Sequence, residues 1–201
     1  MMTITYPVNK GLYINMTNRC PCNCTFCLRH NAEGVYGSDS LWLDREPTVQ
    51  EVCDSVDTWD LPQFDEVVFC GYGEPTERLE DLLLVAKYIK AKGDIKIRIN
   101  TNGLADLIWQ KQTAPSLKGL IDTVSISLNT PNQEDYLKVV RPKFGAGSYD
   151  AMLRFAKDCT AYVPNVVMTV VDVVTTKEEQ EQCRKICENI GARLRVRPFE
   201  E

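Results

Sequence analysis

The chain has 201 residues, which suits one domain spanning residues 1–201, and its hydrophobic content of 44% is normal for a globular core. The formal net charge of −5 argues against non-specific nucleic-acid binding, and the apolar runs are too short to span a membrane. The first residues lack the basic start and apolar core of a secretory signal, so we expect the nine cysteines to stay reduced in the cytoplasm.

The first predicted strand, residues 11–17, leads into a loop that carries Cys20, Cys22, Cys24 and Cys27. Three of these cysteines have the spacing C-x3-C-x2-C, and three thiolates on one tight loop can hold three irons of a cubane cluster. The fourth iron would keep an open position, which indicates chemistry rather than a structural role. A zinc site made by all four thiolates is the alternative, although zinc sites usually combine two separated pairs.

After an irregular stretch at residues 33–38, Thr48 and Glu51 form a capping box that starts the first predicted helix. From there strands and helices alternate to the end of the chain. We expect the later strands at residues 66–70, 95–100, 123–129, 165–173 and 193–197. We expect the later helices at residues 79–89, 104–110 and 134–140, then one capped by Ser148 and one that runs from a second capping box at Thr176 to Gly191.

This alternation predicts parallel strands joined by right-handed crossovers. A closed barrel of eight such units typically needs about 250 residues. Six predicted strands therefore favour an α/β fold with a partial (βα)6 TIM-like barrel, and a doubly wound sheet is the alternative.

Three of the predicted strands alternate apolar and polar residues, so one face of each is polar. Amphipathic helices need the apolar face, which leaves Arg98, Ser125, Arg195 and their neighbours pointing into the barrel. Burying cations in a dry interior would be very unfavourable, so we expect a wet or ligand-filled cleft that suits an anionic group. A strand at the sheet edge, with its polar face in solvent, is the alternative.

Polar motifs follow the strands at the ends where such folds place their pockets. Gly71–Pro75 follows the second strand, Asn100–Gly103 the third, and Ser127–Asn129 ends the fourth. In this order, and downstream of the cysteine loop, the motifs resemble those of the radical S-adenosylmethionine (SAM) superfamily over nearly the whole chain. Within that superfamily the chain looks most like the stand-alone TatD-associated radical SAM proteins.

The resemblance implies that Cys20, Cys24 and Cys27 hold a 4Fe-4S cluster whose open iron binds SAM. Reductive cleavage of SAM would then give a 5′-deoxyadenosyl radical that abstracts hydrogen from a substrate. It also implies an electron donor such as flavodoxin or ferredoxin, and a link to TatD-type hydrolases. The residues expected to contact SAM, or in the last two cases SAM or substrate, are Phe26, Tyr72, Gly73, Glu74, Thr101, Asn102, Ser127, Asn129, Asp172 and Arg197.

The expected substrate is small and anionic, because of the basic interior. A glycyl-radical-type activase that acts on a partner protein is one alternative, and a non-catalytic binding protein stabilised by zinc or a cluster is another. Cys22 is expected to be a bystander and His30 a surface residue. Cys70 is expected to be a core residue, and a position facing the pocket is the alternative. Cys183 and Cys187, one helical turn apart, are expected to be core or surface thiols.

Overall fold

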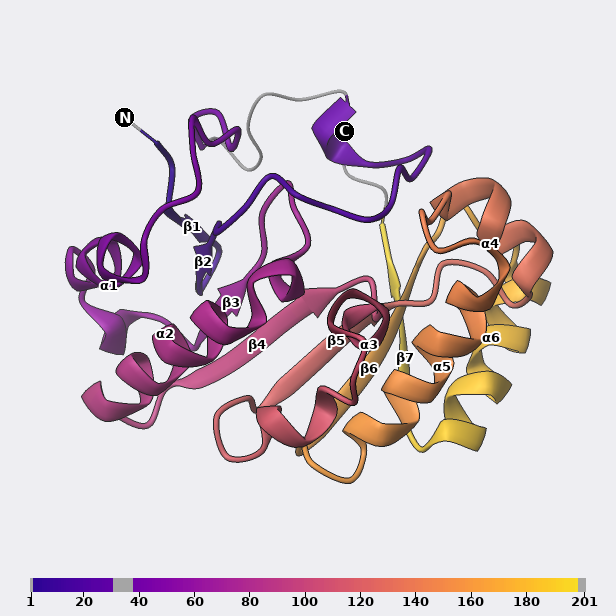
Figure 1. The fold of residues 1–201 in the computed structure, drawn as a ribbon. Coiled ribbons are helices and arrows are strands. Elements are labelled where there is room, and N and C mark those ends of the chain that lie inside the picture. Colours follow the sequence, from indigo (N-terminus) through magenta and orange to yellow (C-terminus); the bar gives the residue numbers. More distant parts are fainter. Residues whose placement is uncertain (1, 31–37, 199–201) are drawn as a thin grey trace.

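The computed structural model describes residues 2–30 and 38–198, so most of the irregular stretch expected at residues 33–38 lies outside the described residues. Seven strands form one open, curved sheet, in the same order in space as in sequence (Figure 1). The strands are β1 (Thr5–Val8), β2 (Gly11–Ile14), β3 (Glu66–Phe69), β4 (Lys96–Thr101), β5 (Thr123–Ser127), β6 (Asn165–Val171) and β7 (Arg193–Arg197). Strands β2 to β7 are parallel, which confirms the expected partial barrel.

Strand β1 was not expected from the sequence. It pairs antiparallel with β2 across a two-residue turn at Asn9 and Lys10, where Asn9 takes a φ of 52°. It is only four residues long and contains Pro7, which an edge strand tolerates and a central strand does not. The first predicted strand was also too long, because β2 ends at Ile14 rather than at residue 17.

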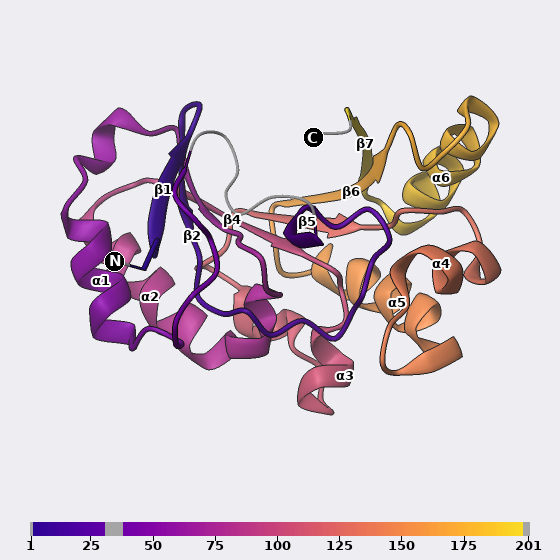
Figure 2. The ribbon, with the colours of Figure 1, turned by 90° about the horizontal axis from the view of Figure 1, so that it is seen from above.

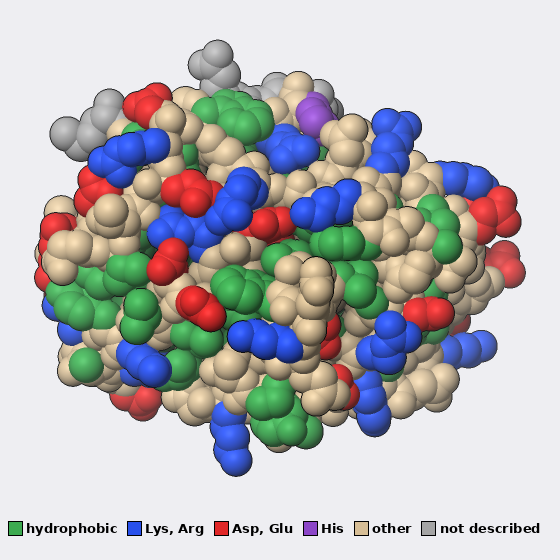
Figure 3. Space-filling model, in the orientation of Figure 1, with side chains coloured by type: hydrophobic (Ala, Val, Ile, Leu, Met, Phe, Trp, Pro, Cys, Tyr) green, Lys and Arg blue, Asp and Glu red, His purple; other side chains and the backbone are tan. Residues whose placement is uncertain are grey.

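The helices lie on the convex side of the sheet, as Figure 2 shows from above. They are α1 (Val49–Asp57), α2 (Leu79–Lys92), α3 (Ala105–Trp109), α4 (Gln133–Val140), α5 (Ser148–Cys159) and α6 (Lys177–Ile190), and short 3-10 turns include one at Leu28–His30. None of the described helices is both long and apolar enough to cross a membrane. On the helix-covered face in Figure 3, acidic and basic side chains are interspersed, as expected for a solvated surface.

The helix ends mostly follow the predicted capping chemistry. Both capping boxes form, and Gly191 ends α6 in the left-handed conformation with a φ of 87°. The prediction for Ser148 is wrong, because Gly147 occupies the N-cap position and Ser148 is the first helical residue. The Ser148 hydroxyl is buried and has no hydrogen-bond partner among the described residues.

The main core lies between the sheet and the helices. The apolar residues of the alternating strands face it, and Ile97, Val124 and Ile126 are fully buried there. In β4 and β5 the polar neighbours face the concave side, which confirms the expected alternation there. Strand β7 is an edge strand whose Arg193 and Arg195 are exposed, so the alternative of a polar face in solvent applies to it. On the concave side a cleft of about 350 Å³ is lined by Glu66, Arg98, Thr123, Ser125, Val167, Arg193, Leu194 and Arg195.

Candidate functional site

The cysteine loop follows β2 and crosses above the carboxyl ends of the strands (Figure 2). Its backbone is fastened to the end of α4, because the amide of Asn23 donates to the Val140 carbonyl at 3.1 Å and that of Thr25 to the Val139 carbonyl at 2.8 Å. The amide of Lys143 donates in turn to the Pro21 carbonyl at 2.8 Å. The loop conformation is therefore set by a segment more than a hundred residues further along the chain.

The four thiols of the loop lie within electrostatic range of one another. Cys20, Cys24 and Cys27 are half-buried, whereas Cys22 is buried. The Cys22 thiol donates a hydrogen bond to Cys20, which lowers the pKa of Cys20. Burial raises the pKa of Cys24 to about 12 and raises that of Cys27, and in both cases the guanidinium of Arg29 opposes the shift. Arg29 is a site residue that the sequence analysis missed, although it stands two positions after Cys27.

The surroundings of the thiols fit an iron–sulfur cluster. The amide nitrogen Nδ2 of Asn102 lies 3.6 Å from the Cys22 sulfur and 4.0 Å from that of Cys20. The buried hydroxyl of Tyr136 has no partner among the described residues, and burial together with Cys22 and Cys24 raises its pKa. Both groups can donate hydrogen bonds to cluster or thiolate sulfur.

No three cysteine, histidine, aspartate or glutamate side chains in the described part of the chain surround one point as ligands of a single ion would. A cubane makes no such demand, because each thiolate binds a different iron. All nine cysteines are described and free, so none is used in a disulfide. The three predicted cluster ligands therefore remain available.

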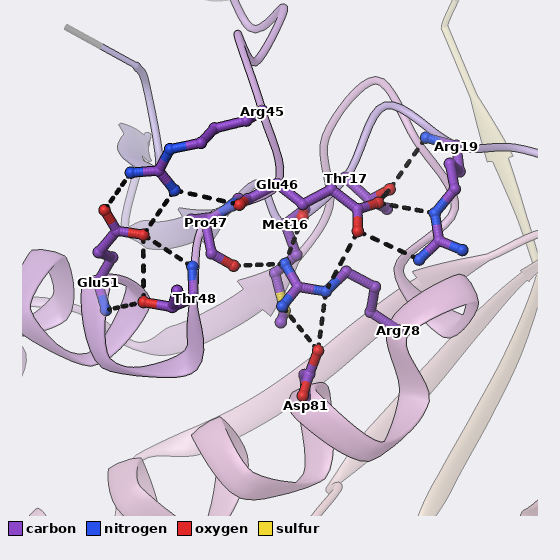
Figure 4. A network of polar contacts seen from close by, with 10 residues as sticks. All are labelled: Met16, Thr17, Arg19, Arg45, Glu46, Pro47, Thr48, Glu51, Arg78 and Asp81. Carbon is purple, nitrogen blue, oxygen red and sulfur yellow. Dashed lines mark hydrogen bonds and ion pairs between the residues drawn. The ribbon is translucent and has the colours of Figure 1, made fainter.

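A polar network holds the start of the loop against α2 (Figure 4). The guanidinium of Arg78, which is 8% exposed, donates to the carbonyls of Met16 at 2.9 Å and Pro47 at 2.6 Å, and it pairs with Asp81 at 2.6 Å. Glu46 accepts from Thr17 and Arg19 in the same network. Arg78 thus joins three segments that are distant in sequence.

We expect Arg78→Met to lower the free energy of unfolding by about 3 kcal/mol, because two buried carbonyls lose a charged donor. Chemical denaturation monitored by circular dichroism measures this change. The control is Arg184→Met, whose exposed pair with Glu181 should contribute less than about 0.5 kcal/mol. Equal stability of the two variants would contradict the role given to Arg78.

The loop after β3 packs directly against the cysteine loop. The amide of Glu74 donates to the Arg19 carbonyl at 2.8 Å. At Gly73 an added Cβ would lie 2.1 Å from the Thr17 carbonyl oxygen and 2.7 Å from that of Arg19, closer than any real contact. Glycine is therefore needed at this position for the two backbones to meet.

The Glu74 carboxylate joins the loop after β3 to the loop after β4. Oxygen Oε1 accepts from the Thr76 amide, the Thr76 hydroxyl and the Thr101 hydroxyl, and Oε2 accepts from the Asn102 amide at 2.7 Å. Burial raises the pKa of Glu74, and these four donors oppose that shift because they stabilise the anion. Asn102, whose side chain faces the cysteine sulfurs, is positioned by this carboxylate.

Two of the other residues predicted to contact SAM present buried polar atoms without partners. Asn129, with a left-handed φ of 66°, follows β5, and its Oδ1 has no partner among the described residues. The same holds for Nε of Arg197 at the end of β7. The Arg197 carbonyl accepts from the amide of Asp172, so the ends of β6 and β7 are joined. Such atoms are expected where a polar ligand completes the hydrogen bonding.

The positions of Phe26, Ser127 and Tyr72 support a contact with SAM less directly. Phe26 and Ser127 are half-buried at the same end of the sheet. Tyr72 is 6% exposed and packs with Tyr6, Val8 and Leu41, so its ring supports the segment that follows the cysteine loop. Its contact with SAM stays a prediction.

The predictions about Cys70, His30, Cys183 and Cys187 have different outcomes. Cys70 does not belong to the helix-facing core, because its thiol accepts a hydrogen bond from Asn100 and lies near Arg98 and Arg197 on the concave side. The strand ends at Phe69, whose side chain is in the core, so the alternation puts Cys70 on the concave side. His30 is exposed, as expected. Cys183 and Cys187 are buried in the core, which was one of the two expected placements.

The open barrel of parallel strands thus carries, across its carboxyl ends, three cysteines that can hold an iron–sulfur cluster where such folds place their active sites. The family is shown directly by the sequence. The chain belongs to the Radical SAM superfamily, whose family model matches residues 14–188. Members of this superfamily use a 4Fe-4S cluster and SAM, and they generally need a reductant such as flavodoxin or ferredoxin.

Solved structures share the fold at low sequence identity. The FeFe-hydrogenase maturase HydG from Carboxydothermus hydrogenoformans matches with a TM-score of 0.68 and 17% identity over 95% of this chain and 44% of its own. A radical SAM methyltransferase from Sphaerobacter thermophilus matches with a TM-score of 0.64 and 17% identity over 96% of this chain and 57% of its own. SuiB from Streptococcus suis, bound to S-adenosylmethionine, matches with a TM-score of 0.65 and 17% identity over 94% of this chain and 38% of its own. The chain thus spans less than two thirds of each of these proteins.

Proposed function

We propose that this protein is a radical SAM enzyme in which Cys20, Cys24 and Cys27 hold the 4Fe-4S cluster. When bound and reduced by one electron, the cluster and SAM would supply a 5′-deoxyadenosyl radical for abstraction of a hydrogen atom from the substrate. The observation that carries the proposal is the joining of the cysteine loop to the strand-end motifs through Gly73, Glu74 and Asn102. A zinc-stabilised binding protein has no need of these contacts.

Four residues besides the cysteines would help to hold the cluster and SAM. Arg29 offsets the negative charge of the thiolates, and Asn102 donates to their sulfur atoms. Asn129 and Arg197 offer an unpaired acceptor and an unpaired donor to SAM. Cys22 stays outside the ligand set, because the family spacing does not use it.

We also propose a subgroup, an electron donor and a cellular location for the protein. The stretches around the cysteine loop, Gly73 and Asn129 support membership in the TatD-associated group, and with it a functional link to TatD-type hydrolases. A flavodoxin or ferredoxin is the proposed electron donor. The proposed location is the cytoplasm, which suits nine free cysteines.

The test is anaerobic reconstitution with iron and sulfide, followed by reduction with dithionite in the presence of SAM. We expect a brown protein that loses its colour in air and forms 5′-deoxyadenosine, detected by chromatography. A colourless protein that retains one zinc ion and forms no 5′-deoxyadenosine would refute the proposal.

We expect Glu74→Ala to weaken SAM binding at least about 10-fold without loss of the cluster, because four buried donors lose their acceptor and Asn102 is no longer fixed. Anaerobic calorimetry gives the SAM affinity and an iron assay gives the cluster content. The control is Glu80→Ala, which removes an exposed carboxylate from α2 and should leave both quantities unchanged. Wild-type SAM affinity in Glu74→Ala would remove Glu74 from the site.

A further inference from the structure

The concave face of the sheet carries a second concentration of charge, nearer to the amino ends of the strands than the cysteine loop. Three arginines and one glutamate are among the residues that line the cleft there. The lining therefore has a formal charge of +2, although the whole chain has a net charge of −5. A local excess of this sign in a negatively charged protein indicates an anionic ligand.

One of the three arginines is neutralised and held rigidly. The Arg98 guanidinium, 13% exposed, donates to both oxygens of Glu66 at 2.7 and 3.1 Å. It also donates to the Tyr13 hydroxyl at 3.2 Å. The pair of Arg98 and Glu66 is therefore rigid and has no net charge. It does not offset the positive charges of Arg193 and Arg195 on β7.

The arginines of β7 have no acidic partner in the described part of the chain. The side chains of Arg193 and Arg195 are both exposed. The contact of Arg193 is a long one, 3.5 Å to Oδ1 of Asn165, and Arg195 makes no hydrogen bond or ion pair with the residues that the structure describes, 2–30 and 38–198. Arg195 lies beside Thr169 in the register, and Arg197, two residues on, lies beside Val171 with a buried, unpaired Nε. Guanidiniums side by side without counter-ions repel one another, so an anion between them would be stabilising.

We propose that this cleft binds the oxyanion group of the substrate, a phosphate or a carboxylate, with Arg193 and Arg195 as its ligands. The guanidinium fork matches both groups in a bidentate arrangement. The hydroxyls of Thr123 and Ser125 line the opposite side and supply further donors. The inference rests on the proposed function, because it makes this anion the anchor of the molecule that reacts at the cysteine loop.

The position of the cleft suits such an anchor. Each strand rises about 3.3 Å per residue, so Arg195 lies roughly 7 Å from Arg197, at the strand end. A small molecule held at Arg195 can extend along the concave face toward the carboxyl ends of the strands, where the loop that carries the cysteines lies. Arg195 thereby fixes the distance between the anion and the reacting carbon.

The experiment titrates the anaerobically reconstituted holoprotein with sodium pyrophosphate and, separately, with sodium succinate, in a calorimeter at constant ionic strength and without divalent cations. We expect saturable binding of at least one of these anions. Arg195→Gln should weaken it at least about 10-fold, the usual effect of losing one charge-assisted pair. The matched control Arg184→Gln removes the same charge from the exposed surface of α6 and should bind like wild type.

The two probes separate the two ligand chemistries, since preference for pyrophosphate indicates a phosphate and preference for succinate a carboxylate. Arg193→Gln provides a second variant should Arg195→Gln unfold, as judged by its thermal midpoint. Absence of binding by wild type, or equal binding by wild type and both cleft variants, overturns the inference. Wild-type 5′-deoxyadenosine formation without anion binding would refute this inference alone, whereas anion binding without SAM cleavage would refute the proposed function alone.

Discussion

Replacing Cys24 by alanine should abolish assembly of the iron–sulfur cluster, and with it all cleavage of SAM. A cubane left with two thiolates from the loop is poorly held, and no other cysteine lies on the loop except the bystander Cys22. Iron and sulfide content after anaerobic reconstitution, together with the visible absorption spectrum, measure the loss. Iron content equal to that of wild type would contradict the assignment of Cys24.

Cys22→Ala is the matched control on the same loop. Its thiol lies beside Cys20 and Asn102, but the C-x3-C-x2-C spacing does not use it. We expect this variant to retain iron and to form 5′-deoxyadenosine. If Cys22→Ala loses its iron and Cys24→Ala keeps it, the ligand set must be redrawn to include Cys22.

Gly73→Ala should lower the free energy of unfolding by about 3 kcal/mol, the upper part of the range for an added methyl group in a closely packed place. The new Cβ would lie 2.1 Å from a backbone oxygen, and backbone atoms cannot turn aside as a flexible side chain can. The loops must separate, which would also weaken the contact between Glu74 and Arg19. Urea denaturation of the apoprotein measures the first effect, and SAM affinity of the holoprotein measures the second.

Gly147→Ala is the control for this glycine. Its φ of −68° is open to any residue, and an added Cβ meets nothing within 4 Å. Its stability should stay within about 0.5 kcal/mol of wild type, as is usual for surface positions. A Gly73→Ala variant as stable as Gly147→Ala would show that the loops after β2 and β3 can separate at little cost.

Much of the fold could be predicted because its signals are local. The capping boxes at Thr48 and Thr176 and the left-handed end at Gly191 are fixed by neighbouring residues, and the structure has all three. The alternation in β4 and β5 also predicted which side chains face the helices. Strand β1 was missed because its four residues are stabilised by pairing with β2 rather than by a pattern of their own.

The sequence by itself determined the cysteine spacing, the order of the strand-end motifs and hence the superfamily, because these depend on residue types at fixed separations. Only the tertiary structure decided how those motifs meet. Glu74 binds the loop after β4, Arg78 holds the base of the cysteine loop, and Cys70 lies on the concave side near Asn100 and Arg98. These contacts join residues that are far apart along the chain, so they depend on the packing of the loops above the curved sheet, which no local pattern records.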